Sequence, residues 1–122
     1  MNSAIVEIME KTGHVLPKAH HTDKLMSQLA TDVYENTGFE NFGIPFCMTV
    51  EAEVLGSEIN FGTLECEPKI QKEIYPTVSD VEFLPLNAMS KHNRVGAVVN
   101  TIYNLSKSNP DIPAIGSLTG PL

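Results

Sequence analysis

The expected fold follows from residues 41–62, which read NFGIPFCMTVEAEVLGSEINFG. The stretch opens with a short apolar run over residues 42–48, of the length that a buried strand needs. Thr49 comes next, where its hydroxyl could cap a helix, and Gly56 would end that helix after a single turn. A buried strand, a polar turn and a short helix make the βα unit of an α/β protein.

Several polar side chains follow the apolar run directly. Because chemistry in α/β proteins sits at the carboxyl ends of strands, these are the first candidates for a site: Cys47, Thr49, Glu51 and Glu53. The two glutamates stand near a helix start, where the helix dipole favours negative charge. They are two residues apart and so do not share a helix face, which argues against a paired-carboxylate acid–base role.

Length and composition indicate one small globular domain. The chain has 122 residues, of which 42% are hydrophobic and 19% charged. A net charge of −7 argues against nucleic acid as the main partner. No apolar run approaches the roughly 20 residues of a membrane helix, and no signal peptide is visible. Cys47 and Cys66 are therefore expected to be reduced thiols, and the protein is expected to be cytoplasmic.

Before the central stretch, the pattern predicts two helices and a short strand. A helix is expected over residues 1–11 and a brief strand over residues 14–16. Thr22 and Asp23 would start a second helix with one wide apolar stripe, and Gly38 would cap its end.

After the central stretch, the pattern is weaker. Residues 57–61 are expected to be extended, and residues 63–85 form a long excursion with a helical turn at 70–74. Asn87 would cap a further helix, and residues 112–117 would form a last strand. Successive βα units imply parallel strands, about three here. A barrel of eight takes roughly 250 residues, so we expect a fragment or one piece of a split protein.

Three segments together carry a family resemblance: residues 12–20 (TGHVLPKAH), 45–62 and 118–121. Their spacing resembles the uroporphyrinogen decarboxylase superfamily, and more closely its methylcobamide:coenzyme M methyltransferase branch. The resemblance covers nearly the whole chain but only the amino-terminal third of the family's barrel. It implies one partial domain, residues 1–122, of a (β/α)8 TIM barrel.

The resemblance also implies an activity. Family methyltransferases, which serve methanogenesis, move a methyl group from a corrinoid, carried on a partner protein, to a zinc-activated thiol such as coenzyme M. The chain would be inactive alone. The alternatives are a decarboxylase-like enzyme acting on a tetrapyrrole, or a non-catalytic domain that self-associates, or pairs with a complementary barrel fragment, to cover its strand edges.

Departures from the decarboxylase pattern favour the methyltransferase branch. Decarboxylases carry Gly-Arg-Tyr-Leu-Pro where residues 13–17 read GHVLP, so His14 replaces an arginine that holds a substrate carboxylate. A second such arginine falls on Glu10, which reverses the electrostatics. An aspartate that faces the pyrrole nitrogens falls on Cys47, and a thiol is a poor acceptor.

The family's zinc ligands are absent from this sequence. The resemblance implies a His-x-Cys pair and a later cysteine, all in the carboxyl-terminal half, and no His-x-Cys occurs here. We therefore assign no metal ligand and no catalytic residue, and expect zinc only in the remaining part of the barrel. A zinc site made from this chain's own thiols and from His20 and His21 lacks the spacing of a zinc motif.

Six residues are expected to face substrate or corrinoid: His20, Cys47, Thr49, Glu51, Thr119 and Gly120. Four of them have a plainer interpretation: Cys47 as a buried small apolar group, His20 as a surface residue beside a helix cap, Glu51 as an ordinary acid at a helix start, and Gly120 as part of a turn. His14 and Arg94 are expected to be structural or surface residues.

Overall fold

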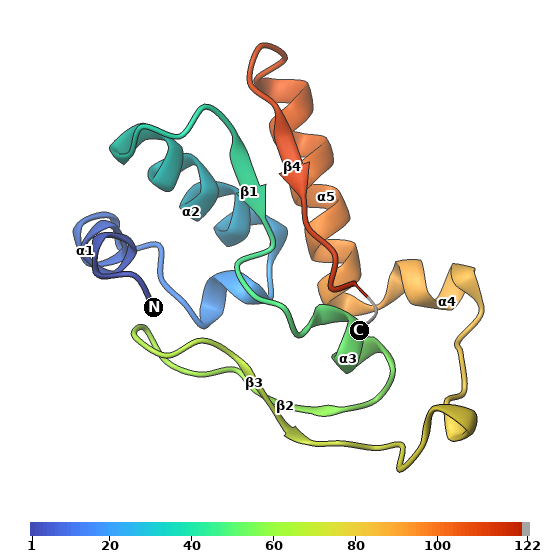
Figure 1. The fold of residues 1–122 in the computed structure, drawn as a ribbon. Helices are drawn as coiled ribbons and strands as arrows, with labels where there is room; N and C mark the ends of the chain where they lie inside the picture. The colour runs from blue at the N-terminus through green and yellow to red at the C-terminus, as the bar shows by residue number, and fades with distance from the viewer. Residues whose placement is uncertain (121–122) are drawn as a thin grey trace.

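The chain folds into helices packed around a small parallel sheet, with a separate hairpin below them (Figure 1). The computed structural model describes residues 1–120. The elements in order are α1 (Ser3–Thr12), η1 (Lys18–His20), α2 (Asp23–Asn36), β1 (Phe42–Ile44), α3 (Val50–Val54), β2 (Glu58–Asn60), β3 (Lys69–Lys72), η2 (Val78–Asp80), α4 (Leu86–Lys91), α5 (Asn93–Ser108) and β4 (Ala114–Gly116).

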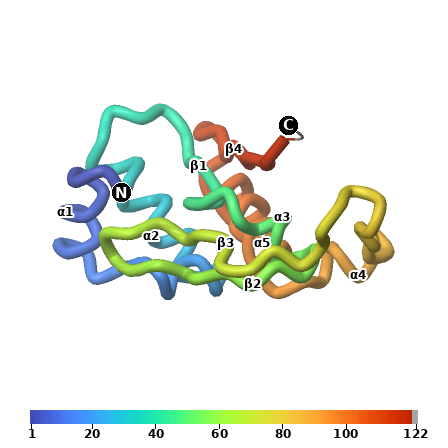
Figure 2. The backbone as a smooth tube through the Cα atoms, turned by 60° about the horizontal axis from the view of Figure 1, so that its bottom comes forward, coloured from blue at the N-terminus to red at the C-terminus, as the bar shows by residue number. Residues whose placement is uncertain are grey.

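The parallel pair β1–β4 holds the main core. Gly43 lies opposite Ile115 in the register, and the two strands point the same way in Figure 1. Helices α2 and α5 pack together under one face of the pair, as Figure 2 shows. Phe42 and Ile44 point from β1 into this layer, so the predicted α/β fold with parallel strands is confirmed.

The opposite face of the pair is bare. Side chains alternate across a strand, and between the buried Phe42 and Ile44 the glycine at position 43 is exposed. Its neighbour Ile115 is 49% exposed. The parallel sheet of residues 1–120 has two strands, so the expected number of about three parallel strands is wrong.

A second apolar cluster joins α1, η1 and α2. Its buried members are Met9, Leu16, Ala19 and Leu29. The brief strand predicted over residues 14–16 is not formed, because Leu16 is buried in this cluster and its N–H donates to Met9 Sδ at 3.4 Å. His20 consequently lies on a 3-10 turn rather than after a strand.

The start of α2 follows the prediction, but its end does not. The Thr22 hydroxyl oxygen accepts from the Leu25 N–H at 3.3 Å, as an N-cap should. The expected glycine cap at Gly38 is wrong. Thr37 is the capping residue, and its hydroxyl donates to the Val33 carbonyl at 2.7 Å, which leaves no need for a left-handed glycine.

The long excursion contains an antiparallel hairpin. β2 pairs with β3, so the extended piece predicted at 57–61 exists but belongs to no parallel sheet. The helical turn predicted at 70–74 is wrong. Gly62 has φ +74°, which reverses the chain tightly and brings residues 69–72 back alongside β2.

The predicted helix capped by Asn87 is two helices. Asn87 lies inside α4, which begins at Leu86, and the extended backbone of His92 separates α4 from α5. The predicted last strand is shorter than expected, since β4 covers three residues. Within residues 1–120, no helix has the length and apolar character needed to cross a membrane.

Candidate functional site

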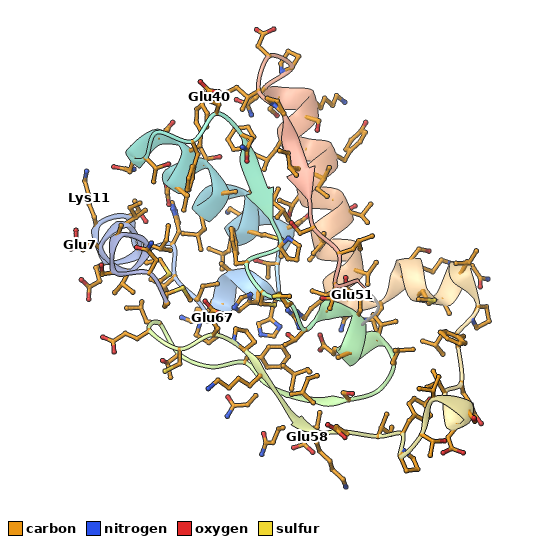
Figure 3. All side chains as sticks on the ribbon, viewed as in Figure 1. Glu7, Lys11, Glu40, Glu51, Glu58 and Glu67 are labelled. Atoms are coloured by element: carbon orange, nitrogen blue, oxygen red, sulfur yellow. The ribbon has the colours of Figure 1, made fainter. Side chains whose placement is uncertain are left out.

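A pocket opens at the carboxyl ends of β1 and β4. Its volume is about 310 Å³, and its walls come from the residues that follow each strand and from the hairpin: Pro45, Phe46, Cys47, Met48, Glu67, Ser117, Leu118 and Thr119. Glu67 lies on the hairpin where it passes below η1 (Figure 3). The predicted site residues Cys47 and Thr119, 72 positions apart in the chain, thus line one pocket.

Arg94 lies beneath this pocket and is 2% exposed. Its Nη2 donates to Cys47 Sγ at 2.6 Å. Its Nη1 donates to Glu53 Oε2 at 2.8 Å and to Thr49 Oγ1 at 3.3 Å. A buried guanidinium must be paired and hydrogen-bonded, and the first turn of α3 supplies those partners.

The position of Arg94 follows from the break before α5. Because that helix starts at Asn93, its first turn faces the start of α3 and the end of β1. Thr49 stands at the N-cap position of α3 but makes no capping bond, since its hydroxyl contacts Arg94 and lies 3.4 Å from the Cys47 sulfur. The expected capping bond of Thr49 is therefore wrong, whereas Arg94 is a buried structural residue, one of the two roles expected for it.

Thr119 is tied to the first turn of α3. Its N–H donates to Glu51 Oε1 at 3.0 Å, and its hydroxyl donates to the Met48 carbonyl at 3.1 Å and to Glu51 Oε2 at 3.2 Å. Glu51 and Glu53 therefore point to different partners, as their spacing predicted. Gly120 is exposed, and Pro121 of the resembling segment lies outside the described residues.

His20 is buried beside these groups. It is 1% exposed, and neither of its ring nitrogens has a hydrogen-bond partner. Its ring centroid lies 6.5 Å from that of Phe46, a wall of the pocket. Burial lowers the pKa of His20 to about 4, with further contributions from the charges of Arg94 and His21. The plainer interpretation of His20 as a surface residue is therefore wrong.

Comparison with known proteins now identifies the family. The family model for uroporphyrinogen decarboxylase (URO-D) matches residues 1–122. The chain belongs to the URO-D family. Among its relatives, a methylcobamide:CoM methyltransferase MtaA of Methanosarcina barkeri is 38% identical over 121 residues. A methylcobamide:CoM methyltransferase MtbA of Methanosarcina acetivorans is 36% identical over 120 residues.

A solved methyltransferase structure agrees with these relatives. A methyltransferase from Methanosarcina mazei superposes with a TM-score of 0.84 at 32% identity, covering 94% of this chain and 34% of its own. The MtaA and MtbA alignments each cover 98% of this chain and 35% of the relative. The resemblance to the methyltransferase branch is confirmed, and the chain spans about a third of the length of these relatives.

The URO-D chain offers no metal site within residues 1–120. No group of three or more His, Cys, Asp or Glu side chains there could hold a metal ion. Cys47 is engaged by Arg94, Cys66 is exposed, and His14 Nδ1 pairs with Asp32 Oδ2 at 2.6 Å.

Besides Arg94, sequence reasoning missed Glu67 and Phe61 as residues of this site. Glu67 reaches the pocket from the hairpin. Phe61 lies against Arg94, with 5.2 Å between the guanidinium carbon and the ring centroid, and makes an edge contact with His21 at 4.4 Å. For Glu67 the available signal was the length of the excursion over residues 63–85, because long loops in compact domains are commonly functional. Phe61 precedes that excursion and had no such signal.

Proposed function

We propose that this chain forms the amino-terminal part of a corrinoid-dependent methyltransferase. The complete enzyme would move a methyl group from a methylated corrinoid protein to a zinc-activated thiol such as coenzyme M. Without the rest of the barrel, the chain would be inactive. The observation that carries the proposal is 38% identity to a methylcobamide:CoM methyltransferase over nearly the whole chain.

The position of the pocket supports the same proposal. Enzymes with α/β barrels carry their active sites at the carboxyl ends of the strands, and the pocket with Cys47 and Thr119 lies at those ends. In this proposal Arg94 holds Cys47 and the start of α3 in place, and Thr119 fixes the loop after β4. These residues would shape one wall of the cavity that receives substrate and corrinoid.

Two apolar grooves support the completion of a barrel. One, of about 340 Å³, lies beside β1 and includes Gly43, Leu29 and Phe46. The other, of about 690 Å³, lies beside the end of β4 and includes Val98, Ile102 and Leu118. Both free edges of the parallel pair are thus flanked by apolar surface, which further strands and helices of a (β/α)8 barrel would cover.

Zinc is not assigned to the residues of this chain. The described part lacks a three-residue ligand group, and the Cys47 sulfur already accepts from Arg94. We therefore propose that zinc is held by the part of the enzyme beyond the matched third. When bound there, it would lower the pKa of the acceptor thiol.

The test joins this chain to the remaining two thirds of the Methanosarcina barkeri relative. The chimera, purified with zinc, is given methylcobalamin and coenzyme M, and methylated coenzyme M is quantified. We expect methyl transfer above the rate of the relative's two thirds alone. Absence of transfer from a folded, zinc-loaded chimera would refute the proposal.

An Arg94→Met variant of the chimera tests the role of the site. Removing the guanidinium leaves Cys47, Thr49 and Glu53 without their shared partner, so we expect at least about a tenfold loss of rate. Lys107→Met is the matched control, because Lys107 is an exposed cation of the same helix whose Nζ lies 5.8 Å from the ring centroid of Tyr103. It should retain the parent rate.

A further inference from the structure

Two buried side chains that contact residues of the pocket wall carry unpaired nitrogen atoms. Both ring nitrogens of His20 and the Nε of Arg94 are buried without a partner. The two side chains are 1% and 2% exposed, and the charge of Arg94 acts on His20. A buried polar group left unpaired costs about 1–3 kcal/mol, so such a cluster calls for a molecule that pairs with it.

The hairpin covers this cluster loosely. Phe61 rests on Arg94 and His21, and Leu64 packs on the cluster around Leu16 and Ala19. Within residues 1–120, no hydrogen bond or salt bridge joins residues 58–72 to the rest of the chain. A segment that is held only by apolar contacts can separate from the protein and return more readily than one that is held by hydrogen bonds.

Lifting the hairpin would join the cluster to the pocket. Glu67 belongs to the hairpin and forms part of the pocket wall. Phe46 lies between the two spaces, since it lines the pocket and its ring faces His20. A ligand in the pocket could then reach His20 past Phe46.

The chemistry of the cluster selects the ligand group. A pKa of about 4 keeps His20 neutral at physiological pH, so its ring offers one N–H donor and one nitrogen acceptor. Arg94 adds an N–H donor at Nε, while its charge is balanced by Glu53. A primary carboxamide matches this set, because its NH₂ donates to the free imidazole nitrogen and its carbonyl accepts from an N–H.

We propose that His20 and Arg94 form a binding site for a primary carboxamide, reached when the hairpin of residues 58–72 lifts. The inference rests on the proposed function, in which the ligand is a cobamide, a corrinoid with primary carboxamides around its ring. His20 would be a residue that recognises the rim of the cofactor rather than its metal.

The test compares two neutral corrinoids that differ in their side chains. Dicyanocobinamide carries primary carboxamides, whereas the heptamethyl ester of dicyanocobyrinic acid accepts hydrogen bonds but has no N–H donor. Dissociation constants are measured by titration with the 122-residue chain and its variants. The wild type should bind the amide corrinoid at least about tenfold more tightly than the ester.

Variants at His20 test whether this side chain provides the preference for the amide corrinoid. His20→Phe should weaken binding of the amide corrinoid about tenfold and abolish the preference over the ester, whereas His20→Gln should retain part of it. His14→Phe is the matched control, because His14 is also a histidine of the chain but its Nδ1 pairs with Asp32 Oδ2 at 2.6 Å. It should behave as the wild type.

Three results would overturn the inference: no binding of either corrinoid by the wild type, equal binding of both, or an unchanged preference in His20→Phe. The last two would mean that buried water alone satisfies the cluster. Methyl transfer by the chimera is measured separately, so transfer without an amide preference would remove this inference and leave the proposed function standing. An amide preference without methyl transfer would count against the proposed function and leave the carboxamide site standing.

Discussion

At the scale of single residues, the site depends on one buried cation. Arg94 holds a thiol, a hydroxyl and a carboxylate from residues 47–53 in one arrangement. Burial lowers the pKa of His20 to about 4, and the charge of Arg94 contributes to the same shift. The charge of Arg94 is thus balanced within the chain by Glu53, while its Nε–H has no partner.

The unusual state of His20 predicts a pH dependence of stability. The folded-state pKa of about 4 lies below the ordinary histidine pKa of 6.5, so between these pH values the unfolded chain binds more protons than the folded one. The free energy of unfolding should therefore fall as the pH drops from 6.5 to 4, by about 3 kcal/mol in total from this group.

Urea unfolding of the wild type and of His20→Phe at several pH values checks this prediction. Because phenylalanine does not titrate, the variant should lose about 3 kcal/mol less than the wild type over the same window. Parallel pH profiles for the two proteins would show that His20 is not held neutral in the fold.

Part of the site could be predicted from sequence at this scale. Cys47, Thr49 and Glu51 follow an apolar run, and the rule that sites form at strand ends led directly to them. Arg94 could not be found this way, because it lies 47 positions beyond Cys47 on a helix whose start depends on the break at His92. A buried arginine carries no local sequence signal.

At the scale of elements, the hairpin of residues 58–72 contributes to the pocket wall and has an exposed strand, β3. Phe61 and Leu64 hold it against the body, and Glu67 reaches the pocket. Its reversal depends on Gly62, where a Cβ atom would lie 2.1 Å from the Cys66 carbonyl oxygen and φ is +74°. Both facts exclude a side chain at this position.

Gly62→Ala should therefore release the hairpin. Trypsin cuts after lysine, and β3 carries Lys69 and Lys72, so cleavage at these sites should become at least about tenfold faster. Gly38→Ala is the matched control, since nothing lies within 4 Å of its Cβ position and φ is not positive. Equal cleavage of both variants would contradict the tight-turn account.

Sequence patterns predicted the helices better than the hairpin. The apolar stripe after Thr22 extends over several turns, so α2 could be recognised from one segment alone. β3 is four residues long and exposed throughout, so no alternation of apolar and polar residues marks it. Its pairing with β2 depends on a turn that only the folded backbone reveals.

At the scale of the whole molecule, the parallel pair is open on both edges. The face of the pair that points away from α2 and α5 is exposed at Gly43 and Ile115, and apolar grooves flank the pair on both sides. The alternation of helices and strands predicted this architecture from sequence. The number of strands was overestimated, because residues 14–16 join an apolar cluster instead of a sheet.

Hydrogen exchange at the strand edges tests the barrel most directly. In a parallel ladder bonded and free amides alternate, and the amides of Phe42 and Ser117 are bonded within the pair. Those of Gly43 and Gly116 therefore face the free edges. Exchange is measured by NMR with the chain alone and with the polypeptide that corresponds to the other two thirds of the Methanosarcina barkeri relative.

If the chain is one third of a closed barrel, added strands will pair with both edges. The Gly43 and Gly116 amides should then exchange at least about tenfold more slowly, while those of Phe42 and Ser117 serve as the internal reference. Unchanged exchange at Gly43 and Gly116 in the presence of a folded partner polypeptide would contradict the account.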